Sequence, residues 1–153
     1  MSQPSVIHTT FVIERNYPVS PEKVFAALSD PAKKRRWFGT GEGSTTDSFE
    51  MDFRVGGIER TVRQHASGAM TFTNDSVYRD IVPGRRIVIA YNMSVNDVRI
   101  SSSLSTYELL PNGAGTDLIF TEQAAFFENA DGPQMRQDGW RKLLESLGKY
   151  LGD

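Results

Sequence analysis

The stretch Pro133–Leu151, PQMRQDGWRKLLESLGKYL, predicts one long amphipathic helix at the C-terminal end of the chain. Its apolar residues follow the spacing i, i+3, i+4, i+7, i+11, which places them on one helical face. They are Trp140, Leu143, Leu144, Leu147 and Leu151. The segments before it are strand-like, so this face must pack on a sheet. A long helix laid across a curved sheet tends to leave a cavity between the two, and this cavity is our first guide to function.

Composition narrows the class of protein. The 153 residues fit one domain spanning 1–153, and 39% hydrophobic with 24% charged residues is ordinary globular usage. A net charge of −2 argues against a nucleic-acid partner. The start of the chain is polar, and no apolar run approaches the roughly 20 residues of a membrane helix, so we expect a cytoplasmic protein without membrane contact.

Metal and thiol chemistry have no support in the sequence. Cysteine is absent, which removes disulfides, thiol catalysis and thiolate metal sites together. The histidines are His8 and His65, and neither has a carboxylate or histidine at a familiar zinc spacing. We therefore expect no metal site and no cofactor.

Two short helices are expected near the N-terminus, after a first strand at Val6–Tyr17. Ser20-Pro21 and Asp30-Pro31 each combine an N-cap residue with proline at the first helical position. The second helix carries the basic run 33–36 and ends at Trp37-Phe38. Four charges on one short helix usually form a solvated face, although they could also attract an anionic ligand. Gly39, Gly41 and Gly43 follow as a predicted loop.

From Asp47 the hydrophobic period changes to two, which indicates six further strands. In the first of them Phe49, Met51 and Phe53 form the inner face. The next strands are expected at 58–66, 70–82, 87–93, 98–106 and 116–126, the last two joined by a hairpin turn at 111–115. For the strand that begins at Val98, we assign Ile100, Ser102, Leu104 and Thr106 to one face together with Val98.

This order of elements, together with particular residues, resembles the START-like (helix-grip) superfamily, also called SRPBCC. Within it the chain looks like the group named after the C-terminal domain of the activator of the heat-shock-protein-ninety ATPase. The matching pieces are Pro21-x-x-Val24-Phe25, Asp30-Pro31 with Trp37-Phe38, Asp52-Phe53-Arg54-Val55-Gly56-Gly57, Tyr78 with Ile81-Val82-Pro83, Gly115-Thr116-x-Leu118 with Thr121-Glu122, and Gly139-Trp140 with the leucines that follow.

The resemblance implies an α+β fold in which a curved seven-stranded antiparallel sheet wraps around one long C-terminal helix, with two short helices after the first strand. It also implies a pocket between sheet and helix for an apolar or aromatic small molecule. It implies no co-chaperone activity, because in the eponymous activators a separate N-terminal domain contacts the chaperone.

Ten residues are the candidate ligand-binding set. The expected pocket lining is Met51, Phe53, Tyr91, Met93, Leu104, Phe120, Glu122 and Trp140, and the expected pocket mouth is Trp37 and Phe38. The two mouth residues serve equally well as a gate over a ligand or as a plug that closes the core, whereas Trp140 belongs to the helix stripe and favours core packing. The pocket hypothesis requires a cavity of a few hundred cubic ångströms, the lower end for ligand sites.

Glu122 is the candidate for polar chemistry. It shares strand parity with Leu118 and Phe120, so if these two face inward, the carboxylate does too. It could orient a ligand hydroxyl or amine, or act as a general base with a raised pKa. Alternatively, the strand end turns it outward, or an arginine such as Arg60 pairs with it.

Three functions follow, in order of preference. The first is binding of a small apolar or aromatic molecule. The second is an enzyme of the cyclase, dehydratase or isomerase type, as the superfamily resemblance implies, with Glu122 or Tyr78 as acid or base. The third is a protein-interaction domain or a homodimer without a ligand.

Overall fold

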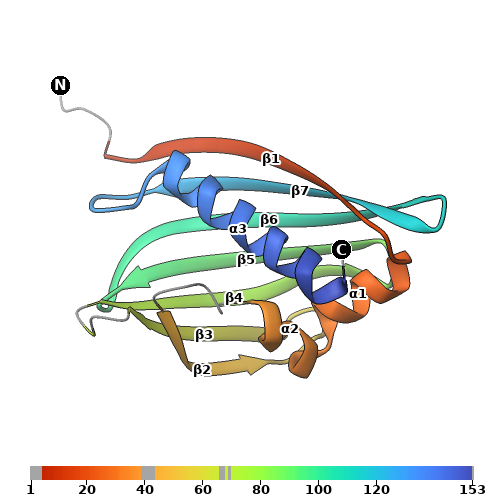
Figure 1. The fold of residues 1–153 in the computed structure, drawn as a ribbon. Helices are drawn as coiled ribbons and strands as arrows, with labels where there is room; N and C mark the ends of the chain where they lie inside the picture. The colour runs from red at the N-terminus through yellow and green to blue at the C-terminus, as the bar shows by residue number, and fades with distance from the viewer. Residues whose placement is uncertain (1–4, 39–43, 66–67, 69, 153) are drawn as a thin grey trace.

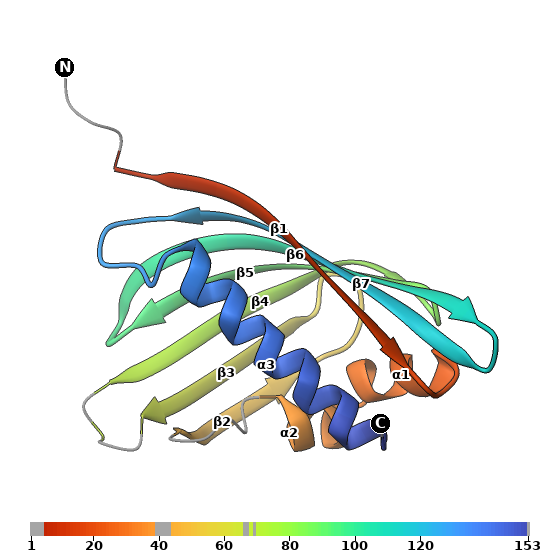
Figure 2. The same ribbon diagram turned by 45° about the horizontal axis from the view of Figure 1, so that its top comes forward.

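Helix α3 (Pro133–Leu151) lies diagonally across one face of a curved seven-stranded sheet in the computed structural model of the chain (Figures 1 and 2). The structure describes residues 5–38, 44–65, 68 and 70–152, and for residues 44–47 only the backbone. The bounds of α3 are those that the apolar spacing predicts. The predicted loop at Gly39, Gly41 and Gly43 lies outside the described residues.

The sheet is antiparallel throughout, in the order β1-β7-β6-β5-β4-β3-β2. After β1 at one edge, the chain crosses to the opposite edge through two short helices and then returns strand by strand until β7 pairs with β1 (Figure 1). The elements are β1 (Ile7–Tyr17), α1 (Pro21–Ser29), α2 (Pro31–Trp37), β2 (Ser44–Met51), β3 (Ile58–His65), β4 (Thr71–Val82), β5 (Arg86–Val95), β6 (Val98–Asn112) and β7 (Gly115–Phe126). The predicted α+β helix-grip architecture is confirmed.

The two short helices are separated by Asp30, which serves both. Its backbone N–H donates to the carbonyl of Ala26 and ends α1, while its carboxylate accepts from the backbone N–H groups of Ala32 and Lys33 at 2.9 and 3.2 Å and begins α2. The residue before a proline is disfavoured in helical conformation, so the chain must bend at this point. The chain changes direction at this bend, and α2 packs against both α1 and α3.

The core lies between the concave face of the sheet and the apolar stripe of α3. Trp140, Leu144 and Leu147 of that stripe are buried, and the Tyr17 hydroxyl donates to the backbone carbonyl of Leu144 at 2.7 Å. Arg136 lies on the same face, one turn before Trp140, and is buried as well. None of the helices in the described part of the chain combines the length and apolar character that a membrane crossing requires.

The face assignment of β6 is wrong. Ile100 and Ser101 are both buried, and Ser103 and Ser105 are buried after them, so Leu104 points to the outer face of the sheet. The cause is an irregularity in the pairing with β5, where the register shifts between Met93 and Ser94 and inserts one extra residue into β6. One extra residue reverses the side on which every later side chain lies.

Candidate functional site

The space between the sheet and α3 is filled mainly by aromatic side chains. The ring of Trp140 lies 4.3 Å from that of Phe120 and 6.2–6.4 Å from those of Phe38, Tyr91 and Tyr107, measured between centroids. A pocket of a few hundred cubic ångströms between sheet and helix, as the sequence led us to expect, is not found among the described residues.

A cavity of about 20 Å³ remains beside this cluster, which is room for about one water molecule. It lies where α2, α3 and strands β3 to β6 meet. Its walls are formed by Lys34, Phe38, Glu59, Asn74, Ser76, Ile89, Tyr91, Ser105, Tyr107 and Trp140. Apolar and aromatic side chains form part of this wall, and charged or hydroxyl groups reach it from every strand that borders it.

Glu122 of β7 anchors the polar groups on the α3 side of the interior. Its side chain is 0% exposed, and Oε1 accepts hydrogen bonds from the Tyr91 hydroxyl and from Ser105 Oγ, both at 2.9 Å. Oε2 has no hydrogen-bond partner among the described residues. The inward orientation predicted from strand parity is therefore what the structure shows, while Arg60 instead pairs with Asp75 on the outer face.

Arg136 joins α3 to this cluster. Its guanidinium donates to the Tyr91 hydroxyl at 3.1 Å and to Ser101 Oγ at 2.8 Å, and it forms a two-pronged pair with Asp131 through Nε and Nη2, both at 2.8 Å. The distance from Nη1 to Glu122 Oε2 is 3.9 Å. Arg136 is therefore paired mainly with Asp131, and the negative charge of Glu122 is only partly compensated.

The protonation of Glu122 follows from this arrangement. Burial raises the pKa of Glu122 to about 7, although Arg136 and the hydrogen bonds from Ser105 and Tyr91 act in the opposite direction. Burial and the neighbouring carboxylate also raise the pKa of Tyr91 well above its ordinary value. Near neutral pH, Glu122 can therefore gain or lose a proton while Tyr91 stays protonated.

A second polar cluster lies on the α2 side of the cavity. Lys34 Nζ is 2.8 Å from Glu59 Oε1, and the same oxygen accepts a short hydrogen bond from the Tyr78 hydroxyl. Lys34 also sits over the ring of Phe38, 4.8 Å from its centroid. Because burial and Glu59 raise the pKa of Tyr78 well above its ordinary value, the candidate catalytic Tyr78 is a fixed donor to Glu59 at neutral pH.

The structure separates the predicted ligand-binding residues into three groups. Phe38, Tyr91 and Trp140 line the cavity, and Phe120 and Glu122 lie directly behind them. The residues Trp37, Met51, Phe53 and Met93 pack into or against the core instead. Trp37 is buried and donates from Nε1 to the backbone carbonyl of Ala27 at 2.9 Å, an arrangement that favours the interpretation as a plug of the core. Leu104 lies on the opposite side of the sheet.

Sequence reasoning missed Lys34, Glu59, Asp131 and Arg136. Lys34 was assigned to a solvated basic face, yet it is 2% exposed, whereas Lys33, Arg35 and Arg36 are exposed. One signal was present for Arg136, because it precedes Trp140 by four residues and therefore shares its helical face. In the described part of the chain, no group of three or more histidine, aspartate or glutamate side chains could hold a metal ion.

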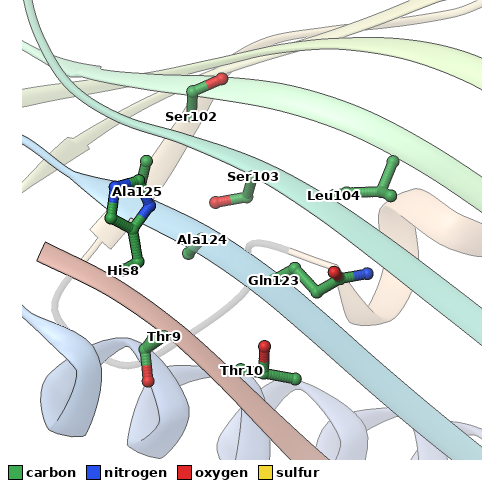
Figure 3. A pocket seen from close by; sticks show the side chains of 9 residues that line it. All are labelled: His8, Thr9, Thr10, Ser102, Ser103, Leu104, Gln123, Ala124 and Ala125. Carbon is green, nitrogen blue, oxygen red and sulfur yellow. The ribbon is translucent and has the colours of Figure 1, made fainter.

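The outer face of the sheet carries a more open hollow of about 630 Å³ across β1, β7 and β6 (Figure 3). His8, Ala125 and Ser102 are cross-strand neighbours there, and so are Thr10, Gln123 and Leu104. The side chain of Ala125 is shorter than those of its neighbours His8 and Ser102, and this difference leaves the depression. The described residues that line this outer hollow include no aspartate, glutamate, lysine or arginine, whereas the interior gathers charged and hydrogen-bonding groups, so the interior is the candidate functional site.

A curved antiparallel sheet packed on a long C-terminal helix, with a polar-lined cavity between them, defines a START-like helix-grip protein. The chain belongs to the family described as activator of Hsp90 ATPase homolog 1-like protein, whose model matches residues 18–152. Ligand binding is common in this family, and polyketide cyclase-like members occur. A comparison of the sequence with curated proteins finds no match.

Solved structures agree with this assignment. The Mll3558 protein from Rhizobium loti is 46% identical, with a TM-score of 0.88 over 96% of this chain and 99% of that one. A putative uncharacterized protein from Rhizobium leguminosarum is 36% identical, with a TM-score of 0.91 over 96% of each chain. Protein CV1439 from Chromobacterium violaceum is 26% identical, with a TM-score of 0.79 over 94% of this chain and 97% of that one.

Proposed function

We propose that the protein is a cytoplasmic small-molecule binding protein whose ligand lies between the sheet and α3 and presents a hydroxyl or amine to the interior. The observation that carries this proposal is the convergence of polar side chains from α2 and four strands on one cavity, beside the partly compensated carboxylate of Glu122. Ligand sites are built in this way, with a mostly apolar wall and a few convergent polar groups.

The chemistry of the wall favours a hydrogen-bond donor over the purely apolar ligand suggested by the family resemblance. Two atoms of the wall are buried without a hydrogen-bond partner in the described part of the chain: Asn74 Oδ1, which accepts, and the Tyr107 hydroxyl, which can accept or donate. Glu122 Oε2, directly behind the wall, is a further buried acceptor without a partner there. Leaving a buried polar group unpaired costs about 1–3 kcal/mol, so a ligand donor that pairs with such an acceptor gains affinity. The aromatic rings of Tyr91, Tyr107 and Trp140 suit a flat ligand body.

A ligand larger than one or two heavy atoms must displace a side chain, because the cavity holds about one water molecule. Phe38 is the side chain that we expect to move. It caps the C-terminus of α2 and contacts the cavity between Lys34 and Trp140, so its ring can leave without breaking a hydrogen bond within the sheet. Its ring also has the size of the aromatic body that would replace it.

The test is a thermal-shift comparison of p-cresol, p-toluidine and toluene, which share a ring and a methyl group and differ in the polar substituent. We expect p-cresol or p-toluidine, but not toluene, to raise the melting temperature, and Phe38→Ala to increase the effect. At 100 times its dissociation constant a ligand stabilises the fold by about 2.7 kcal/mol. Glu122→Gln should weaken the response, and Glu145→Gln on the exposed face of α3 should leave it unchanged. Equal responses to all three compounds would contradict the proposal.

A second candidate function is acid–base catalysis on a ketone-bearing substrate, and the specific observation in its favour is the buried carboxylate of Glu122 held by Tyr91 and Ser105, whose pKa burial raises to about 7. A general base works best when its pKa lies near the operating pH. In this case Glu122→Gln should abolish turnover of such a substrate while it leaves binding in place. Loss of binding and turnover together would instead assign Glu122 to recognition alone.

A further inference from the structure

Lys34 occupies an environment that is uncommon for lysine. It is the one buried residue in the run of four basic residues on α2, with 2% exposure, and lysine is almost never fully buried unless it is paired. Its partner Glu59 is buried too, at 4% exposure. The phenyl ring of Phe38 covers the ammonium group on another side, at 4.8 Å from the ring centroid.

The pair also borders the cavity, and this separates it from an ordinary buried ion pair. Both Lys34 and Glu59 contribute to the cavity wall, together with Tyr91 and Ser105. A nucleophile that is kept from bulk water and has a general base beside it can attack a carbonyl once that base has taken its proton. Tyr78 donates to the same Glu59 oxygen and so fixes the carboxylate beside the amine.

We propose that Lys34 forms a Schiff base with a small uncharged aldehyde that enters this cavity, with Glu59 as the proton-transfer group. The inference rests on the proposed function, because it uses the same interior site. The aldehyde is small because the cavity has room for about one water molecule before Phe38 moves. It is uncharged because Glu59 and Glu122 would repel an anion, whereas Lys34 and Arg136 would repel a cation.

The step balances with the groups present. Glu59 takes a proton from the Lys34 ammonium, and the neutral amine attacks the carbonyl carbon to form a carbon–nitrogen bond. A proton moves from nitrogen to oxygen to give the carbinolamine. Glu59 then returns its proton to the hydroxyl, the carbon–oxygen bond breaks, and water leaves as the nitrogen lone pair forms the carbon–nitrogen double bond. Lysine ammonium and aldehyde become a protonated imine and one water.

The test is reductive trapping with acetaldehyde and sodium cyanoborohydride at neutral pH, followed by peptide mapping by mass spectrometry. The chain has four other lysines, Lys23, Lys33, Lys142 and Lys149, and all four are exposed, so they are internal references. At low conversion we expect Lys34 to be alkylated about tenfold faster than the references, which corresponds to a barrier lower by about 1.4 kcal/mol. Alkylation of Lys34 more slowly than all four references, as burial alone would cause, would overturn the inference.

Two variants separate chemistry from folding. Glu59→Gln keeps the shape of the side chain but removes the proton acceptor, so the preference for Lys34 should disappear while Lys33 reacts as before. Tyr78→Phe keeps the Lys34–Glu59 pair and should reduce the preference only in part, which makes Tyr78 a positioning residue. Should Glu59→Gln fail to fold, an unchanged preference in a folded Tyr78→Phe protein would count against the role of this cluster. Slow alkylation of Lys34 with an intact p-cresol response would reject the inference and leave the proposed function standing.

Discussion

The substitution Glu122→Gln should make the protein more stable relative to the wild type as the pH rises. The carboxyl group is fully buried and its pKa is raised by burial from 4.5 to about 7. Glutamine has nearly the same shape, and its carbonyl oxygen can still accept from Tyr91 and Ser105. The variant therefore removes the titration and keeps most of the packing.

The difference between the folded and unfolded pKa of Glu122 sets the sign and size of the change in the free energy of unfolding with pH. Between pH 4.5 and 7 the folded protein holds a proton on Glu122 that the unfolded chain has lost, so the wild-type stability falls with rising pH in this window. The difference between 4.5 and about 7 corresponds to roughly 3 kcal/mol in full. Between pH 5 and pH 8 we expect about 2.5 kcal/mol of this effect, since part of the loss occurs below pH 5.

Urea denaturation of the wild type and of Glu122→Gln at pH 5, 6, 7 and 8 would measure it. The other titrating groups are common to both proteins and cancel in the difference. Glu145→Gln is the matched control, because its side chain is 65% exposed and lies on the same helix as Arg136. A difference that stays constant with pH would refute the reasoning, because it would mean that Arg136 keeps Glu122 ionised throughout the range.

Three further predictions concern the contacts of α2 and α3. Trp140→Ala should cost about 3–5 kcal/mol in urea melts, the usual range for a core aromatic, and a cost below about 1 kcal/mol would contradict its placement in the core. Arg136→Met should lower the free energy of unfolding by about 3–5 kcal/mol, because it leaves the carboxylates of Asp131 and Glu122 without their cationic partner. A urea melt unchanged from the wild type would contradict this prediction. Lys34→Met should be strongly destabilising alone, but combined with Glu59→Leu most of the loss should be recovered, and additive losses in the double variant would indicate that the two side chains act independently.

Most of the fold could be read from the sequence, because its elements carry local signals. The apolar spacing of α3 gives its bounds, and Asp30-Pro31 marks the boundary between α1 and α2. Alternation locates the strands, but it fixes the face only while the pairing stays regular. The extra residue in β6 is set by the pairing with β5, which no local pattern of serine residues reveals, and this is why Leu104 was assigned to the wrong face.

The candidate site was predictable only where a strand carried apolar neighbours as a guide. Glu122 lies between Phe120 and Ala124, and all three are buried, so strand parity was sufficient. At the start of β3 the apolar residue predicts the wrong inner face. The apolar Ile58 is 57% exposed there while the charged Glu59 is buried. The partner that makes this burial tolerable is Lys34, twenty-five residues earlier, and a contact of this kind between a helix and a distant strand leaves no trace in either segment alone.

The cost of these buried charges is itself an argument for function at the cavity. A buried ion pair can often be replaced by apolar side chains with no loss of stability, because desolvation offsets the attraction between the charges. The Arg136–Asp131 pair has a structural role of its own, since it joins the start of α3 to the sheet through Tyr91 and Ser101. The pair of Lys34 with Glu59 likewise joins a helix to the sheet, α2 to β3, and it also borders the cavity. Its position in the cavity wall distinguishes it from the Arg136–Asp131 pair, and the proposed chemistry with a ligand in that cavity would give this position a function.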